Sequence, residues 1–144
     1  MGSVPGRPLL VIEDSDEDLT VLLRAFREIG FTWPVVHQSD AARALALLKA
    51  GSVSPAIVLL DLNLPGLDGR NFLKQLKAEE MLQSIPVIVF STSDNPSDVE
   101  FCYRNGASGF VVKEMEFQLQ TDALRALVEY WFKAVLLPRS GRFG

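Results

Sequence analysis

The sequence predicts an α/β protein in which five strand-helix units form one open, doubly wound parallel sheet. Short, continuous apolar runs, which are typical of strands covered on both faces, recur along the chain. Segments with apolar residues at helical spacing lie between these runs. Regular alternation with short connections favours right-handed crossovers and a parallel sheet. At 144 residues the chain is too short for a closed eight-unit barrel, which needs about 250 residues.

The predicted strands are apolar runs of four or five residues. They lie at 9–13, 33–37, 56–60, 86–90 and 109–112. The second run, WPVVH, has the weakest pattern. Its Pro34 lacks the backbone donor that a central strand needs, so we place this strand at an edge of the sheet.

The predicted helices are bounded by residues that commonly begin or end helices. They cover 19–29, 41–48, a segment after 69, the segment 96–104 and about 117–134. Gly30 and Gly51 mark the ends of the first two helices. The fourth helix begins at Asp94 or Asn95, with Pro96 at its first helical position.

Composition limits the class of protein. A net charge of −4, from 18 acidic and 14 basic residues, leaves no broad basic face for nucleic acid. The single cysteine, Cys102, excludes an internal disulfide and fits a reducing compartment. Because the chain lacks a membrane-length apolar run and a signal peptide, we expect a cytoplasmic protein that binds neither nucleic acid nor membrane. We expect residues 1–7 to be a flexible N-terminus or a cloning remnant, 8–137 to be one domain, and 138–144 to be a flexible tail.

Chemically reactive residues follow four of the predicted strands. Glu13 and Asp14 end the first strand, Asp61 the third, Ser91–Ser93 the fourth and Lys113 the fifth. In open parallel sheets the ligand site lies beyond the carboxyl ends of the strands. If the first and third strands are neighbours, three carboxylates converge, and each pair repels by roughly 3 kcal/mol at about 5 Å. Because Mg²⁺ prefers oxygen ligands, the cluster predicts a magnesium site.

Several of the polar residues also have a purely structural interpretation. Asp14 serves as a helix N-cap in that interpretation, and Asp16–Asp18 favour the positive end of the first helix while staying solvated. We assign Asp68 to the turn before the third helix. We interpret His37 and Cys102 as structural or packing residues.

Four segments together resemble the receiver domain of bacterial two-component response regulators. They are VIEDSDED at 11–18, LLDLNLPGLDG at 59–69, IPVIVFSTS at 85–93 and GASGFVVKE at 106–114. The resemblance covers about residues 8–135. It implies the flavodoxin-like fold with strand order 2-1-3-4-5.

The resemblance assigns roles to the acidic residues. Asp61 would accept a phosphoryl group from the phosphohistidine of a sensor histidine kinase. Glu13 and Asp14 would be the acidic pair, and Asp14 and Asp61 would bind Mg²⁺ directly. Asn63 would offer its main-chain carbonyl to the metal. The protein is then not an enzyme but a signalling domain with self-catalysed phosphotransfer and slow autodephosphorylation.

The resemblance also assigns the remaining residues of the site. Ser91 matches the hydroxyl that turns toward the phosphoryl group, Thr92 the small residue after it, and Lys113 the lysine that pairs with a phosphoryl oxygen. Phe110 matches the aromatic residue that changes rotamer with Ser91 in the switch. The family usually has proline after the lysine, whereas this chain has Glu114. Stand-alone regulators that accompany bacterial phytochromes also tolerate another residue there, and the chain resembles that subgroup.

Three other functional classes share parts of this pattern. A phosphatase of the haloacid dehalogenase type needs a second aspartate two residues after the first, where this chain has Asn63. A flavodoxin-type cofactor binder would hold a phosphate after the first strand, where EDSDED would repel it. A receiver-fold binding module that works without phosphorylation remains the alternative.

The end of the chain carries more apolar area than one helix face can bury. Because only LPRSGRFG follows the last predicted helix, we expect the output to pass to a downstream protein by direct contact. We also expect a homodimer through the last helix and its extension. Its predicted contact residues are Tyr130, Trp131, Phe132, Val135 and Leu136. We expect that Trp131 and Phe132 do not face the same core.

Overall fold

Five parallel strands form one sheet in the computed structural model, which describes residues 7–138. Their bounds are β1 Leu9–Ile12, β2 Val35–Gln38, β3 Ile57–Leu60, β4 Val87–Ser91 and β5 Gly109–Val112. The order across the sheet is β2-β1-β3-β4-β5, and every neighbouring pair is parallel. The predicted fold class and strand order are therefore confirmed.

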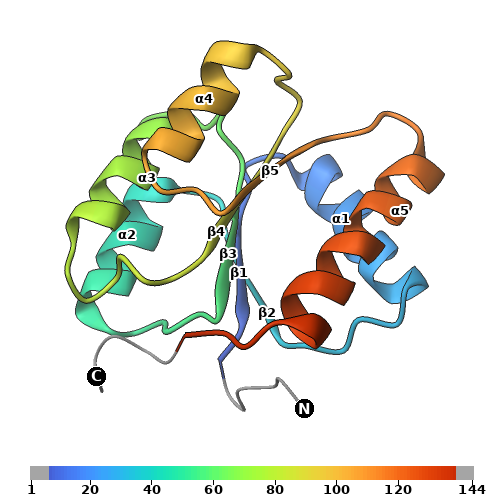
Figure 1. Ribbon diagram of the computed structural model, residues 1–144, viewed down its shortest axis with the longest axis horizontal. Helices are drawn as coiled ribbons and strands as arrows, with labels where there is room; N and C mark the ends of the chain where they lie inside the picture. Colours follow the sequence, from blue (N-terminus) through green and yellow to red (C-terminus); the bar gives the residue numbers. More distant parts are fainter. Residues whose placement is uncertain (1–6, 139–144) are drawn as a thin grey trace.

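Helices cover both faces of the sheet. Their bounds are α1 Asp16–Glu28, α2 Ala41–Ala50, α3 Gly69–Ala78, α4 Pro96–Arg104 and α5 Phe117–Val128. In Figure 1 the sheet is seen nearly edge-on, with α1 and α5 on one side and α2, α3 and α4 on the other. This two-sided cover explains why the strands are apolar throughout rather than alternating.

Successive residues of β1 and of β3 enter two separate cores. Leu10 of β1 and Val58 of β3 belong to the core beneath α2, α3 and α4. Their neighbours Leu9 and Ile57 belong to the core beneath α1 and α5. Side chains in a strand point alternately to the two faces, so a four-residue strand contributes two side chains to each core.

Polar side chains begin four of the five α-helices. Ser15 caps α1 by accepting a hydrogen bond from the Asp18 N–H, and Asp40 caps α2. Asp68 caps α3, and Asn95 caps α4 with Pro96 at the first helical position. Asp14 is therefore not the cap of α1, so its carboxylate is free for another role. Asn95, not Asp94, begins α4.

The second strand and the last helix differ from their predicted bounds in ways that affect the rest of the fold. β2 begins at Val35, after Pro34, and lies at the sheet edge as expected. The last helix does not continue as an α-helix to Ala134: α5 ends at Val128, and a π-helix, η1, spans Glu129–Ala134. Such i→i+5 turns are rare and short.

Phe132 lies in an aromatic cluster beneath the end of α5. It is 7% exposed, and its ring lies 5.0 Å from Phe31 and 4.7 Å from Trp33, centroid to centroid. Trp131 packs against the same core while staying partly exposed. The expectation that these two neighbours do not share a core is therefore wrong, because the wide π-helical turn brings consecutive side chains closer in direction. Phe132 is also not a surface contact for a dimer.

Arg7 ties the two ends of the described chain to the sheet. Its guanidinium donates to the carbonyl of Pro138 at 2.6 Å and to that of Pro55 at 2.7 Å. Its own carbonyl accepts the indole N–H of Trp33 at 2.6 Å. The predicted flexible ends include Arg7 and Pro138, and both take part in these contacts. Residues 1–6 and 139–144 lie outside the described residues.

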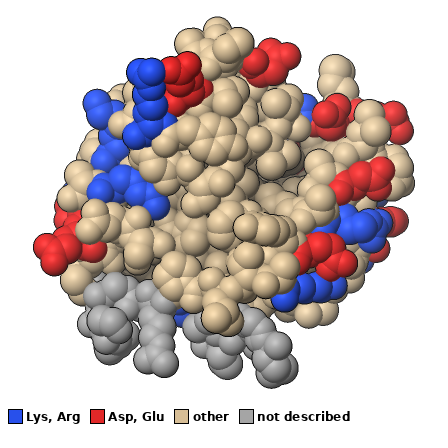
Figure 2. Space-filling view, in the orientation of Figure 1, with Lys and Arg blue, Asp and Glu red and all other residues tan. Residues whose placement is uncertain are grey.

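The charged residues leave no uniformly basic face in the view of Figure 2. Acidic and basic side chains alternate around the rim, and the middle of this face is mostly uncharged. Within residues 7–138, none of the helices combines the length and the apolar character that a bilayer crossing requires.

Candidate functional site

The ends of β1 and β3 bring two carboxylates together. Ile12 pairs with Leu60 in the sheet, so Glu13 and Asp61 follow directly from paired positions. The Asp61 N–H donates to the Ile12 carbonyl at 3.1 Å, which extends the ladder by one step. The two strands are neighbours, which is the condition on which the predicted convergence of carboxylates depended.

Glu13, Asp14 and Asp61 form an acidic triad. One carboxylate oxygen from each lies within 4.8 Å of the others. Glu13 and Asp61 are 4% and 7% exposed, whereas Asp14 is exposed to solvent. Three carboxylates of which two are buried repel one another unless a cation lies between or beside them. Their oxygen donors fit a hard divalent cation.

Lys113 supplies one cation to this cluster from the end of β5. Its Nζ lies 2.6 Å from Glu13 Oε1, 2.8 Å from Asp18 Oδ2 and 3.4 Å from Asp61 Oδ2. Its side chain is 8% exposed. The backbone N–H of Lys113 donates to the Ser91 carbonyl at 2.8 Å, so the β4–β5 pairing fixes where the side chain starts.

The electrostatics of the site depend on these contacts. The pKa of Glu13 is raised to about 7, because burial and, to a smaller extent, the charge of Asp61 outweigh the hydrogen bond and the charge of Lys113, which lower it. Burial alone would lower the pKa of Lys113. Hydrogen bonds to Asp18 and Glu13 and the charge of Asp61 outweigh burial and raise it above its ordinary value. Lys113 is therefore a permanent cation.

Sequence reasoning missed the contact of Asp18 with this site. Asp18 was interpreted as a solvated charge at the start of α1, but it pairs with Lys113, 95 residues away in the sequence. His37 likewise gains a partner, because its Nε2 lies 2.7 Å from the Glu13 carbonyl oxygen. Neither contact can be predicted from the neighbouring residues in the sequence, since each depends on which strand ends are adjacent.

Ser91 and Thr92 occupy different environments at the end of β4. Ser91 is fully buried, and its Oγ accepts a hydrogen bond from the Ser93 N–H at 3.2 Å. Thr92 is exposed and lines a cavity of about 220 Å³ beside Lys113. Lys113 therefore lies between the acidic triad and an open cavity.

The loop after β3 shapes the surroundings of Asp61. The N–H of Asn63 donates to Asp61 Oδ1 at 3.3 Å, and Asn63 itself is exposed. Gly69, the first residue of α3, donates its N–H to the Leu62 carbonyl at 2.9 Å. A Cβ on Gly69 would lie 2.4 Å from the carbonyl oxygen of Asp61. Only glycine allows α3 to begin this close to Asp61.

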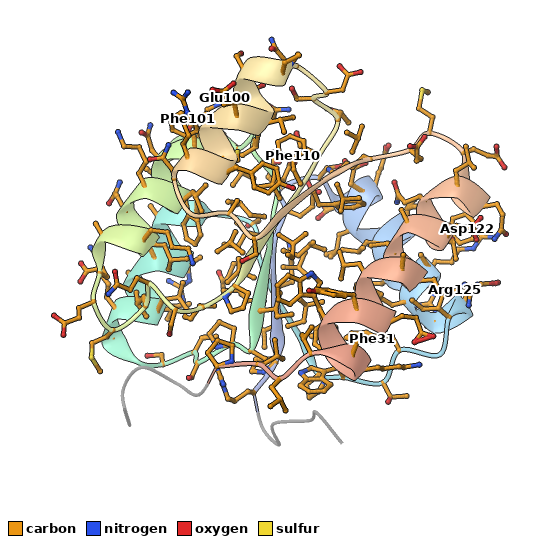
Figure 3. The ribbon with its side chains drawn as sticks, in the orientation of Figure 1. Phe31, Glu100, Phe101, Phe110, Asp122 and Arg125 are labelled. Carbon is orange, nitrogen blue, oxygen red and sulfur yellow. The ribbon has the colours of Figure 1, made fainter. Side chains whose placement is uncertain are left out.

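Phe110 and Glu114 complete the predicted residues. Phe110 of β5 is partly buried against the α2, α3 and α4 core and points toward α4, where Phe101 also lies (Figure 3). The peptide between Lys113 and Glu114 is trans, because no cis peptide occurs in residues 7–138.

Comparison with known proteins identifies the family of this chain. The family model described as the response regulator receiver domain matches residues 9–125. This chain belongs to that family. The receiver domain is a signalling module, and its predicted identity is confirmed.

Relatives of this receiver domain include two curated proteins. The probable methanogenesis regulatory protein FilR2 of Methanothrix harundinacea is 34% identical, with 85% of this chain and 82% of that protein covered. Response regulator Rcp1 of Synechocystis sp. is 29% identical, with 94% and 96% covered.

Solved structures give the same likeness. The phosphorylated cyanobacterial phytochrome response regulator RcpA superposes with a TM-score of 0.85 at 29% identity, covering 92% of this chain and 99% of that one. The Mn²⁺-bound form of Rcp1 superposes with a TM-score of 0.84 at 28% identity, covering 92% and 99%. This receiver domain is therefore similar to phytochrome-associated response regulators, and its acidic triad fits a divalent metal as such a site requires.

Proposed function

We propose that this receiver domain accepts a phosphoryl group on Asp61 from the phosphohistidine of a sensor histidine kinase. The observation that carries the proposal is the placement of Asp61, buried at the end of β3 and 3.4 Å from the Lys113 ammonium. A nucleophile with a fixed cation at its side is the arrangement that phosphoryl transfer requires.

Mg²⁺ is the divalent cation that we propose for the acidic triad. The side chains of Glu13, Asp14 and Asp61 and the main-chain carbonyl of Asn63 would hold it. When bound, it supplies positive charge to the oxygens of the transferring phosphoryl group. The triad supports this assignment because it offers only oxygen donors, which Mg²⁺ prefers.

The transfer needs little covalent chemistry from the protein. A carboxylate oxygen of Asp61 forms a bond to phosphorus, the P–N bond to the donor imidazole breaks, and the imidazole leaves with the electron pair and takes up a proton. Lys113 balances the charge that gathers on the phosphoryl oxygens in the loose transition state. Because these groups belong to the receiver domain, it can catalyse its own phosphorylation.

Autodephosphorylation follows from the same groups. The oxygen of a water molecule forms a bond to phosphorus, the P–O bond to Asp61 breaks, and Asp61 leaves as the carboxylate. No described residue near Asp61 is placed as a strong base for that water, since Lys113 stays protonated and Glu13 is engaged with it. We therefore expect this reaction to be slow.

The output is a change of surface near α4, β5 and α5. Hydrogen bonds from Ser91 and Lys113 to the new phosphoryl oxygens would contribute about 1.5 to 3 kcal/mol each. Two such bonds approach the roughly 5.5 kcal/mol that moves an equilibrium from 1:99 to 99:1. Phe110, partly buried beside α4, is the side chain that we expect to follow Ser91. A downstream protein would read the altered surface by direct contact.

A small-molecule phosphodonor tests the acceptor. With acetyl phosphate and Mg²⁺, the intact mass of the protein should rise by one phosphoryl group, and Asp61→Asn should abolish the rise. Asp68→Asn is the matched control, because Asp68 caps α3 and an asparagine also caps helices. If the native chain gains no phosphoryl group while EDTA and Mg²⁺ samples are both folded, the binding module that works without phosphorylation is the better account.

A phytochrome histidine kinase is the partner that we propose. The likeness to the phytochrome response regulator RcpA supports this choice. A purified bacterial phytochrome kinase carrying a labelled phosphohistidine should transfer its label to this protein faster than a histidine kinase of an unrelated sensor. Equal transfer rates from both kinases would contradict the assignment.

A homodimer through η1 and the segment after it is the assembly that we propose. Tyr130 is 55% exposed and Leu136 is 91% exposed, and Trp131 and Val135 are partly exposed beside them. Such an exposed apolar group marks an interaction surface. Light scattering at micromolar concentration should give the mass of a dimer, and Leu136→Glu should give that of a monomer. A monomeric native protein would contradict the proposal.

A further inference from the structure

Three side chains connect α3, α4 and the loop after β4. The Arg70 guanidinium of α3 contacts Asp98 Oδ1 of α4 through Nε at 3.0 Å and Nη2 at 2.8 Å. The other carboxylate oxygen of Asp98 accepts the Ser93 hydroxyl at 2.7 Å. Asp98 therefore uses one oxygen to hold a neighbouring helix and the other to hold the loop.

Ser93 extends this network to Ser91, the switch hydroxyl of the proposed mechanism. The Ser93 N–H donates to Ser91 Oγ at 3.2 Å, while the Ser93 Oγ accepts the Asn95 N–H at 3.3 Å. Ser91 is fully buried, so its hydroxyl has few alternative partners. Arg70 is thus linked to the Ser91 hydroxyl through Asp98 and Ser93, which contacts Asp98 with its hydroxyl and Ser91 with its backbone N–H.

The Arg70–Asp98 pair differs from the exposed ion pairs of the molecule. Its side chains are 30% and 20% exposed, whereas those of Arg104 and Glu100, also on α4, are 75% and 60% exposed. Hydrogen bonds from Ser93 and Arg70 lower the pKa of Asp98, so the carboxylate stays charged at neutral pH. A partly buried pair in which two guanidinium nitrogens contact one carboxylate oxygen holds its geometry better than an exposed pair on one helix.

We propose that Asp98, fixed by Arg70, is a positioning residue for the Ser91 hydroxyl and acts on it through Ser93. The proposal rests on the proposed phosphorylation of Asp61. In the present arrangement the network holds the loop, and with it Ser91, against α4. A phosphoryl group on Asp61 would draw the Ser91 hydroxyl toward it, and the network resists that shift. The network therefore favours the resting state of the switch and ties any movement of Ser91 to α4.

Two variants and their combination test this path. Asp98→Asn weakens the hold of Arg70 and Ser93 on the loop. Ser93→Ala removes the hydroxyl that reaches Asp98 and keeps the backbone N–H that reaches Ser91. The rate of phosphorylation by acetyl phosphate with Mg²⁺ should rise about threefold to tenfold in each, the range expected for losing one partly exposed, charge-assisted hydrogen bond. The control is Glu100→Gln, which breaks an exposed pair on the same helix.

The double variant separates positioning from general stability. If Asp98 acts through Ser93, then Asp98→Asn should change the rate little once Ser93 is alanine, although it should still lower the melting temperature. Equal rates for Asp98→Asn and the native protein would overturn the proposal, as would effects that simply multiply in the double variant. If the native protein takes up no phosphoryl group, the proposed function fails and this proposal fails with it. If the native protein is phosphorylated, the rates of the variants decide whether Asp98 positions the Ser91 hydroxyl through Ser93.

Discussion

Two cations lie at opposite ends of the same sheet and have opposite surroundings, with Lys113 nearly buried and Arg7 partly buried. Lys113, at the carboxyl end, lies within 3.4 Å of three carboxylates. Arg7, at the amino end, donates only to the carbonyl oxygens of Pro55 and Pro138, and its Nε is buried with no partner among the described residues. The pKa of Lys113 is raised by its anions, whereas burial lowers the pKa of Arg7.

The difference separates a reactive cation from a structural one. The three anions compete for Lys113, so a new anion on Asp61 can redistribute its contacts at small cost. The carbonyls around Arg7 are neutral parts of the backbone and offer no alternative charge. We therefore expect the carboxyl end to control phosphoryl transfer and the amino end to control stability alone.

The largest effect should come from removing Lys113, the cation at the carboxyl end of the sheet. Lys113→Met should slow phosphorylation by acetyl phosphate about a hundredfold or more, because a fixed charge on the transferring group is lost. The measurement is the first-order rate of mass gain. Arg7→Met is the matched control and should leave this rate unchanged. A similar slowing by both substitutions would remove the distinction between the two ends.

Crowding of the backbone beside Asp61, at the carboxyl end of the sheet, should have the next largest effect. Gly69→Ala places a Cβ 2.4 Å from the Asp61 carbonyl oxygen, where backbone and not a flexible side chain must shift. We expect a loss of about 3 kcal/mol in the free energy of unfolding and slower phosphorylation. Urea denaturation measures the first effect.

Gly30→Ala is the control for this substitution. Gly30 has a φ of 75° but nothing within 4 Å of its Cβ position. The Gly30→Ala variant should lose about 1 kcal/mol of the free energy of unfolding from backbone strain alone, and it should keep the native phosphorylation rate. Equal losses at the two glycines would show that crowding against Asp61 is unimportant.

Removing the structural cation should give a smaller, purely structural effect. Arg7→Met keeps the backbone carbonyl that accepts from Trp33 but leaves the carbonyls of Pro55 and Pro138 without their donor. We expect the free energy of unfolding to fall by about 2 kcal/mol, because hydrogen bonds from a partly buried charge are lost. Urea denaturation at neutral pH tests this, and Arg104→Met, which breaks an exposed pair, should change stability little.

The smallest effect concerns pH. The pKa of Glu13 rises from its ordinary 4.5 to about 7 on folding, so the folded state binds this proton more tightly than the unfolded chain does. The stability from this group is complete below pH 4.5 and falls as pH rises to about 7. With metal chelated by EDTA, the free energy of unfolding should fall across this pH range. Glu13→Gln should flatten this part of the profile, and an unchanged slope would contradict the assignment.

The acidic triad shows how far sequence reasoning reaches. Glu13 and Asp61 each end an apolar run, and buried parallel strands place such ends at one edge of the sheet. Local pattern therefore predicts both the fold and the neighbourhood of the two carboxylates. Asp18 escaped prediction because an acidic residue in the first turn of a helix has a sufficient local explanation. Only the position of β5 brings Lys113 within 2.8 Å of it.

Near the two ends of the chain, the sequence pattern did not predict which residues are buried or in contact. Tyr130, Phe132 and Leu136 are all apolar residues of one segment, and their composition predicts an excess of apolar surface. Which of them faces solvent depends on the π-helical turn and on the ring of Phe31, so Phe132 became core and not interface. Arg7 looked like part of an unstructured N-terminus because its partners lie 48 and 131 residues away.

The sequence by itself determined the five strands, the two-sided helical cover and the placement of charged and polar residues at the strand ends, because period and polarity are local properties of the chain. The tertiary structure alone decided how Lys113 is shared among Glu13, Asp18 and Asp61, how Arg7 closes the opposite end, and how Asp98 reaches Ser91 through Ser93. The physical reason is that an ion pair or hydrogen bond acts over about 3 Å, and only folding sets that separation between distant residues.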